Sequence, residues 1–87
     1  MENKLDGNAA AGMLQEIFPY EMTMARITCS GCGTTLAMGE AAAYMHGMGA
    51  VLRCPISDTV LIRMAQVRGR YLLDMSGIRV FELGTES

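Results

Sequence analysis

Three cysteines in two short segments constrain this chain more than any other feature of its sequence. Cys29 and Cys32 are two residues apart and are followed by a glycine, and Cys54 opens a similar segment that ends at Asp58. Cysteines at this spacing point two sulfurs the same way, as in loops that hold a tetrahedral zinc ion. In the second segment Ser57 stands where a fourth thiol is expected. The sequence therefore predicts a tetrahedral metal site that lacks one cysteine ligand.

The fourth position of this site has several candidate ligands. The hydroxyl of Ser57 is a poor zinc ligand because losing its proton is costly, and the carboxylate of Asp58 is chemically better. A water molecule is a further candidate. His46 would complete a Cys3His site, but we expect it at a hairpin tip roughly 13 Å from the second loop. The predicted cofactor is Zn²⁺, and the predicted metal ligands are Cys29, Cys32, Cys54 and Asp58.

Two alternatives to a metal site stay open at this stage. In the first, the site has lost its metal, the cysteines are buried small side chains or Cys29 and Cys32 form a disulfide, and an apolar core holds the fold. In the second, Cys29 and Cys32 perform thiol redox chemistry. Dithiol oxidoreductases place this motif at the start of a helix, which lowers the first thiol's pKa, whereas we expect a strand after Gly33. We therefore favour the metal site over the redox protein.

The hydrophobic pattern predicts one helix followed by a region of strands. Apolar residues recur at helical spacing up to Phe18, which predicts an amphipathic helix over residues 6–18 that Pro19 ends. Runs of β-forming residues follow, interrupted by glycine-containing turns. The expected strands are 22–28, 41–46, 50–53, 59–68, 70–75 and 78–83, with the last three in one meander. The inner face of that meander is predicted to contain Val60, Ile62, Met64, Tyr71, Leu73 and Met75.

These elements predict a single small domain over residues 1–87, with a ribbon-like β region at 22–83. The expected fold class is mainly β (α+β): a zinc-ribbon-like antiparallel β-sheet with one N-terminal amphipathic helix.

Composition and charge limit the partners that we expect. Hydrophobic residues make up 51% of the chain and charged residues 18%, which favours a homo-oligomer or a protein partner. The net charge of -2 gives no general attraction to phosphate. Nucleic acid is a weak candidate, based on the arginines of the last strands: Arg63, Arg68, Arg70 and Arg79. Without an export signal or a long apolar run we expect a cytoplasmic protein with no membrane association.

Two segments resemble a known family. Leu5-Asp6-Gly7-Asn8-Ala9-Ala10-Ala11-Gly12-Met13-Leu14 and Val51-Leu52-Arg53-Cys54-Pro55 resemble the opening and the second knuckle of short bacterial proteins of unknown function. In that family the second knuckle is usually a full CPxC. The resemblance extends from Leu5 to about Arg79 and implies a zinc-ribbon-like fold with a metal site, without any assigned activity. We therefore expect a non-catalytic binding or interaction module, not an enzyme, with a complete or degenerate structural zinc site.

Overall fold

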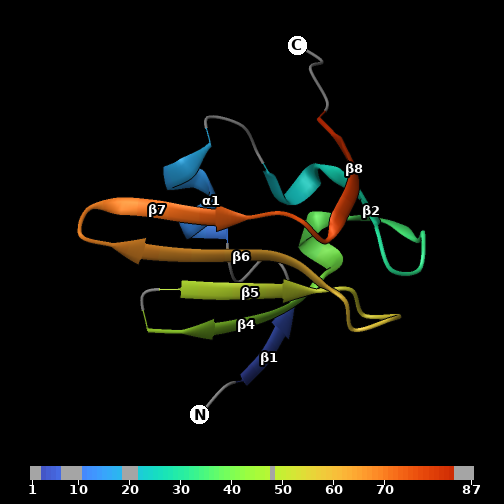
Figure 1. The fold of residues 1–87 in the computed structure, drawn as a ribbon, viewed down its shortest axis with the longest axis horizontal. Coiled ribbons are helices and arrows are strands. Elements are labelled where there is room, and N and C mark those ends of the chain that lie inside the picture. Colours follow the sequence, from blue (N-terminus) through green and yellow to red (C-terminus); the bar gives the residue numbers. More distant parts are fainter. Residues whose placement is uncertain (1–2, 7–10, 19–21, 48, 84–87) are drawn as a thin grey trace.

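The computed structural model describes residues 3–6, 11–18, 22–47 and 49–83, and it shows a mainly β fold with one short α-helix, as predicted (Figure 1). The strands form two antiparallel sheets, one of five strands in the order β1-β4-β5-β6-β7 and one of three in the order β3-β2-β8. The elements in chain order are β1 (Asn3–Asp6), α1 (Ala11–Ile17), η2 (Met22–Met24), β2 (Arg26–Cys29), β3 (Thr35–Ala37), η3 (Met38–Glu40), β4 (Ala42–His46), β5 (Gly49–Arg53), β6 (Val60–Val67), β7 (Arg70–Asp74) and β8 (Ile78–Glu82).

The larger sheet contains the hairpins that the sequence predicts. The predicted hairpins are those of β4 with β5 and of β6 with β7. In addition, β5 pairs with β6, which joins the two hairpins into one sheet. The turn between β6 and β7 consists of Arg68 and Gly69, with φ of 51° and 77°. Two successive residues with positive φ give the type of tight turn that matches the twist of a hairpin.

A bulge bends β6 where it leaves the second cysteine segment. Leu52 pairs with Ile62 but Arg53 pairs with Val60, so Leu61 is an extra residue in the ladder. Both Leu61 and Ile62 are buried, because the bulge interrupts the alternation of faces.

The last strand belongs to the smaller sheet, so the predicted meander of three strands is wrong. β8 pairs with β2, with Ile27 opposite Phe81, and not with β7. The turn before β8 explains the crossing. A Cβ on Gly77 would overlap the carbonyl oxygen of Val60, so the turn lies directly against the start of β6. The Gly77 carbonyl also accepts a 2.9 Å hydrogen bond from the Ser30 amide, which directs the chain toward β2.

The N-terminal part also differs from the prediction. Asp6 lies in β1, opposite Ala42 of β4, so the predicted helix start at residue 6 is wrong. The helix α1 spans Ala11–Ile17, and residues 7–10 and Pro19 lie outside the described residues. The predicted strand over 22–28 begins later than expected, because Met22–Met24 forms a 3-10 turn before β2.

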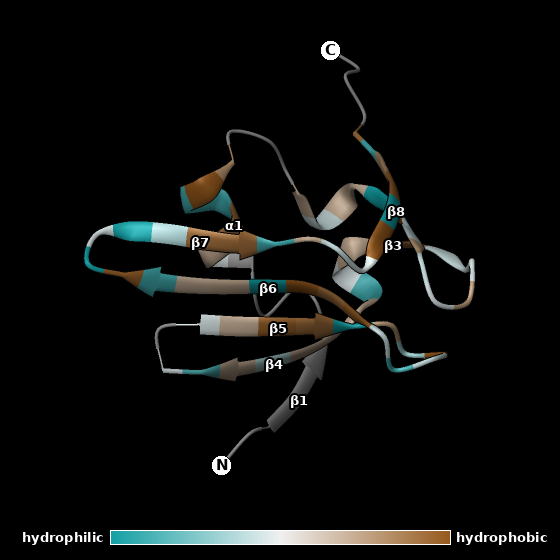
Figure 2. Cartoon of the chain, viewed as in Figure 1, coloured by the Kyte–Doolittle hydropathy of each residue, from teal (hydrophilic) through white to brown (hydrophobic). Residues whose placement is uncertain are grey.

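One core joins both sheets and the helix. Figure 2 shows hydrophobic residues along the central strands and hydrophilic ones at the β6–β7 turn. Of the predicted inner face, Ile62 and Met64 are buried, and Leu73 and Met75 pack against the core. No helix within the described residues is long and apolar enough to cross a membrane. The largest fully buried side chains are Leu14, Met22, Ile27, Cys29, Met38, Leu52, Cys54, Leu61 and Ile62.

Candidate metal centre

The first cysteine loop joins β2 to β3 and is closed by two backbone hydrogen bonds. The amide of Cys29 donates to the carbonyl of Thr34 at 2.8 Å, and the amide of Gly33 donates to the carbonyl of Cys29 at 2.9 Å. Gly33 has a φ of 77°, the left-handed conformation in which glycine carries no steric cost. The loop therefore turns the chain tightly enough to present both of its cysteines on one side.

The second loop joins β5 to β6 and has the same backbone pattern. The amide of Cys54 donates to the carbonyl of Thr59, and the amide of Asp58 donates to the carbonyl of Cys54, both at 2.8 Å. Figure 1 shows the two loops at the same side of the molecule. Because these hydrogen bonds match, each residue of the first loop has a counterpart in the second. Cys29 corresponds to Cys54, Cys32 to Ser57, Gly33 to Asp58, and Thr34 to Thr59.

The two loops bring the three cysteines together. The sulfurs of Cys29, Cys32 and Cys54 all lie within 4.8 Å of one another, and Cys32 Sγ is 3.7 Å from Cys54 Sγ. Zn–S bonds of about 2.3 Å in a tetrahedron give a sulfur–sulfur distance of about 3.8 Å. Cys29 and Cys54 are buried, Cys32 is exposed, and all three are free thiols. The residues present therefore fit a metal that prefers thiolate ligands.

Ser57 lies beside this cluster, at the place that the loop correspondence assigns to a fourth ligand. Its Oγ is 3.5 Å from Cys29 Sγ and 2.8 Å from Thr59 Oγ1. Bonds of about 2.3 Å to sulfur and 2.1 Å to oxygen in a tetrahedron give a sulfur–oxygen distance of about 3.6 Å. The distance between Ser57 Oγ and Cys29 Sγ is thus close to the one expected for two ligands of the same tetrahedral metal.

Hydrogen bonds favour the thiolate form of Cys29. Burial raises the pKa of this thiol, but hydrogen bonds from Ser57, the amides of Cys32 and Gly31, and Thr59 together outweigh burial and lower the pKa to about 6. The amide of Gly31 donates to Cys29 Sγ at 3.3 Å. The thiolate is the form of cysteine that binds metals. At neutral pH this buried sulfur is therefore mainly a thiolate, the form that can bind a metal cation.

Cys32 is affected in the same direction. Its Sγ is 3.2 Å from Thr34 Oγ1, and hydrogen bonding to Thr34 and to Ser57 lowers its pKa below the ordinary value of 9.0. Thr34 and Thr59, at the ends of the two loops, thus each form a hydrogen bond with a cysteine of the site.

Asp58, the predicted fourth ligand, is directed toward Arg53. Its Oδ2 lies 3.6 Å from Arg53 Nη1, and the same nitrogen donates to the Asp58 carbonyl at 3.1 Å. The Arg53 guanidinium also lies 5.9 Å from the ring centre of Tyr44. Within the described residues, the group that could hold a metal comprises the three cysteines and does not include Asp58. A role for Asp58 as a ligand stays a prediction.

His46 lies where the sequence places it, at the tip of the β4–β5 hairpin. It is exposed and pairs with Gly49, whereas Arg53, which precedes Cys54, pairs with Ala42 at the other end of the hairpin. Five-residue strands separate these ends, which excludes His46 from the cysteine cluster.

Close packing holds the two loops together. A Cβ on Gly31 would overlap the hydroxyl of Thr59, so the first loop lies directly against the end of the second. The sequence analysis missed Thr34, Thr59 and Arg53. The signal for the threonines was present, because each stands five residues after the cysteine that opens its loop.

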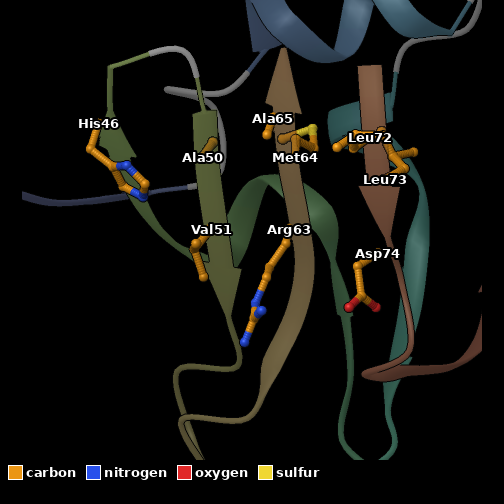
Figure 3. A pocket seen from close by; sticks show the side chains of 9 residues that line it. All are labelled: His46, Ala50, Val51, Arg63, Met64, Ala65, Leu72, Leu73 and Asp74. Carbon is orange, nitrogen blue, oxygen red and sulfur yellow. The ribbon is translucent and has the colours of Figure 1, made fainter. Parts of the chain in front are cut away.

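A second feature is a pocket on the larger sheet, over β4 to β7 (Figure 3). Its volume is about 380 Å³. Its polar side chains are His46, Arg63 and Asp74, and Arg63 and Asp74 are opposite each other in the β6–β7 ladder. Hydrogen bonds from the Ser76 hydroxyl and amide, with a smaller contribution from Arg63, lower the pKa of Asp74. The remaining lining is formed by Ala50, Val51, Met64, Ala65, Leu72 and Leu73.

The fold and the site define a small, mainly β protein in which two corresponding loops gather three cysteines into a candidate metal centre. The chain belongs to the family described as "Family of unknown function (DUF6510)", whose model matches residues 1–86. This confirms the expectation of an uncharacterised family. No match to the chain was found among curated proteins or among solved structures.

Proposed function

We propose that this protein is a zinc-ribbon-like binding module in which Cys29, Cys32 and Cys54 hold a structural Zn²⁺. The observation that carries this proposal is the convergence of three free thiols from two loops within 4.8 Å. A metal shared by both loops would join the end of the larger sheet to β2 of the smaller one. Metal binding of this kind contributes directly to the free energy of folding.

A structural role is favoured over a catalytic one. Catalytic zinc sites need a bound water and a general base close to it. The candidate group within the described residues contains three cysteines and neither a histidine nor a carboxylate. Asp58, the nearest acidic residue in sequence, is paired with Arg53.

Thiol redox chemistry at Cys29 and Cys32 receives less support. The loop between them leads from β2 into β3, not into a helix. Cys29 is also buried, so its sulfur cannot reach and attack the disulfide of a substrate. The short sulfur–sulfur contact joins Cys32 to Cys54 and not to Cys29.

The binding partner that we propose is a protein, including a second copy of the chain. Exposed apolar side chains on the β6–β7 hairpin support this, since Val67 is 46% and Leu72 57% exposed. Nucleic acid is the weaker proposal, because the arginines of the last strands are divided between two sheets, with Arg63 and Arg70 on one and Arg79 on the other. Free thiols favour a reducing compartment, and we propose the cytoplasm.

Elemental analysis of protein purified without chelator tests the metal. We expect about one zinc per chain in the wild type and in Ser57→Cys, which supplies a fourth thiolate. Cys54→Ser removes a buried sulfur and should lose the metal. Zinc in Ser57→Cys alone would show that the native site does not hold it.

The binding role needs separate measurements. Sedimentation of the wild type beside Leu72→Ser tests self-association through the β6–β7 hairpin, and we expect the variant to be more dissociated. Filter binding to DNA and RNA at low salt tests the weaker proposal, and no retention would end it.

A further inference from the structure

We propose that the metal site takes its fourth ligand from outside the chain, and that this ligand is the thiolate of a small-molecule thiol. The inference rests on the metal binding proposed above and specifies what the site recognises. It starts from Ser57, which the structure places where a fourth cysteine would be.

Ser57 holds the fourth position without being suited to bind the metal. Its Oγ is 3.5 Å from Cys29 Sγ, so the hydroxyl is close enough to occupy that position. A neutral hydroxyl is a weak donor to zinc compared with a thiolate or imidazole. The Ser57 hydroxyl also has another partner, Thr59 Oγ1 at 2.8 Å. An incoming ligand therefore displaces only a weak oxygen donor, and Ser57 keeps a hydrogen bond after the exchange.

The fourth position lies beside the exposed residues of the two loops. Cys29 and Cys54 are buried and form the inner side of the cluster. Cys32 and Ser57 are exposed, and between Cys54 and Ser57 the side chain of Ile56 is 71% exposed. A ligand thus reaches the fourth position past the tips of the two loops, without displacing a core residue.

The three sulfurs determine the chemistry of the ligand. A site of three thiolates selects thiophilic metals, and such metals prefer a further sulfur over an oxygen donor. The exchange is balanced: the entering thiol releases its proton to solvent, its sulfur binds the metal, and the oxygen ligand leaves. A second copy of the chain has no spare thiol, because all three of its cysteines belong to its own cluster. A free thiol is therefore the favoured source.

The test uses Co²⁺-loaded protein titrated with glutathione, followed by the visible ligand-field bands and the ultraviolet sulfur-to-cobalt band. In the wild type we expect a saturable rise of the sulfur-to-cobalt band by about one third, as bound thiolates increase from three to four. S-methylglutathione, which has the same charges and no thiol, should leave the spectrum unchanged. Gel filtration after the titration should show cobalt still on the protein.

Two variants serve as matched controls. Ser57→Cys should show the four-thiolate spectrum from the start and should not respond to glutathione. In Ser57→Ala the sulfur-to-cobalt band should still rise by about one third at saturation with glutathione, because the fourth sulfur comes from the added thiol. Its affinity for cobalt should be lower than that of the wild type, because the hydrogen bond from Ser57 to Cys29 is lost.

Different failures have different meanings. If the wild type shows no cobalt bands before thiol is added, the proposed metal site itself is wrong. If the bands form but glutathione does not change them, or strips the cobalt, or acts equally on Ser57→Cys, the metal site stands and the external thiolate is excluded.

Discussion

Asp58 adopts in the second loop the left-handed backbone conformation that Gly33 adopts in the first. The φ angles are 63° and 77°, and each amide donates to the carbonyl of the cysteine four residues earlier. Aspartate tolerates this conformation better than most non-glycine residues. The turn therefore explains the presence of a small polar residue at position 58 without a metal.

Asp58→Asn separates the role of residue 58 in the turn from its predicted role as a metal ligand, since asparagine tolerates the same backbone conformation but lacks the negative charge. We expect the zinc content to be unchanged and the free energy of unfolding to fall by less than about 1 kcal/mol, because an exposed ion pair with Arg53 contributes little. Elemental analysis and chemical denaturation measure the two quantities. Loss of zinc in this variant would instead identify Asp58 as the fourth ligand.

Gly31→Ala should separate the two loops. The added Cβ overlaps the hydroxyl of Thr59, which is held by Ser57, so either the Thr59 side chain leaves Ser57 or the loops move apart. We expect the free energy of unfolding to fall by about 1–3 kcal/mol and zinc to bind more weakly. A competition titration with a coloured chelator measures the affinity.

Gly33→Ala is the matched control for this substitution. Apart from its chain neighbours, no described residue has an atom within 4 Å of a Cβ at Gly33, so the left-handed backbone is what opposes the change, at a cost of about 1 kcal/mol. Zinc affinity should be nearly unchanged. Equal zinc affinity in the two variants would contradict the close packing of the loops.

The reduced, metal-free protein should become more stable as the pH rises from about 6 to about 9. The pKa of Cys29 is about 6 in the folded state, against an ordinary value of 9.0, so the unfolded state binds more protons between these values. The contribution is complete above the ordinary pKa and is lost as the pH falls through about 6. Thermal unfolding in chelator and reductant measures this dependence.

Cys29→Ala is the control for the pH series. Its stability should vary less with pH than that of the wild type, and a smaller dependence should persist because the pKa of Cys32 is lowered as well. An identical pH dependence in both proteins would show that Cys29 is not the group responsible.

The parts of the fold that depend on nearby residues were predictable from the sequence. The hairpins β4–β5 and β6–β7 follow from strand-forming runs separated by short turns, and the cysteine loops follow from their spacing. The helix start was not predictable from periodicity, because Leu5 fits a helical face as well as a strand. Pairing of β1 with β4, far along the chain, decides between the two.

The placement of β8 and the direction of Asp58 depend on information that local patterns lack. The alternation of residues in β8 suits either β7 or β2 as its neighbour, and the close approach of Gly77 to β6 makes the choice. Likewise, the Cys-x-x-Ser-Asp sequence places a carboxylate beside the site, but it does not indicate the positive φ of Asp58 or its 3.6 Å contact with Arg53. For β8 the deciding contact joins distant segments, whereas for Asp58 it joins the two ends of a single loop.

Mild oxidation of the metal-free protein should join Cys32 to Cys54, linking the two loops, rather than join Cys29 to Cys32 within one loop. Cys32 is exposed to an oxidant, and its sulfur is 3.7 Å from that of Cys54. Cys29 and Cys54 are both buried, so burial does not choose between them, but the Cys29 sulfur is also hydrogen-bonded to Ser57 and to the Gly31 amide. Two thiols give up two protons and two electrons, which oxidised glutathione accepts as it becomes two glutathione thiols. Peptide mapping by mass spectrometry identifies the pair.

Cys29→Ala should form the same link and Cys54→Ala should not. Zinc added before the oxidant should suppress the link, because the metal occupies both sulfurs. A disulfide between Cys29 and Cys32 in the wild type would contradict the prediction that the short contact between Cys32 and Cys54 determines the pair.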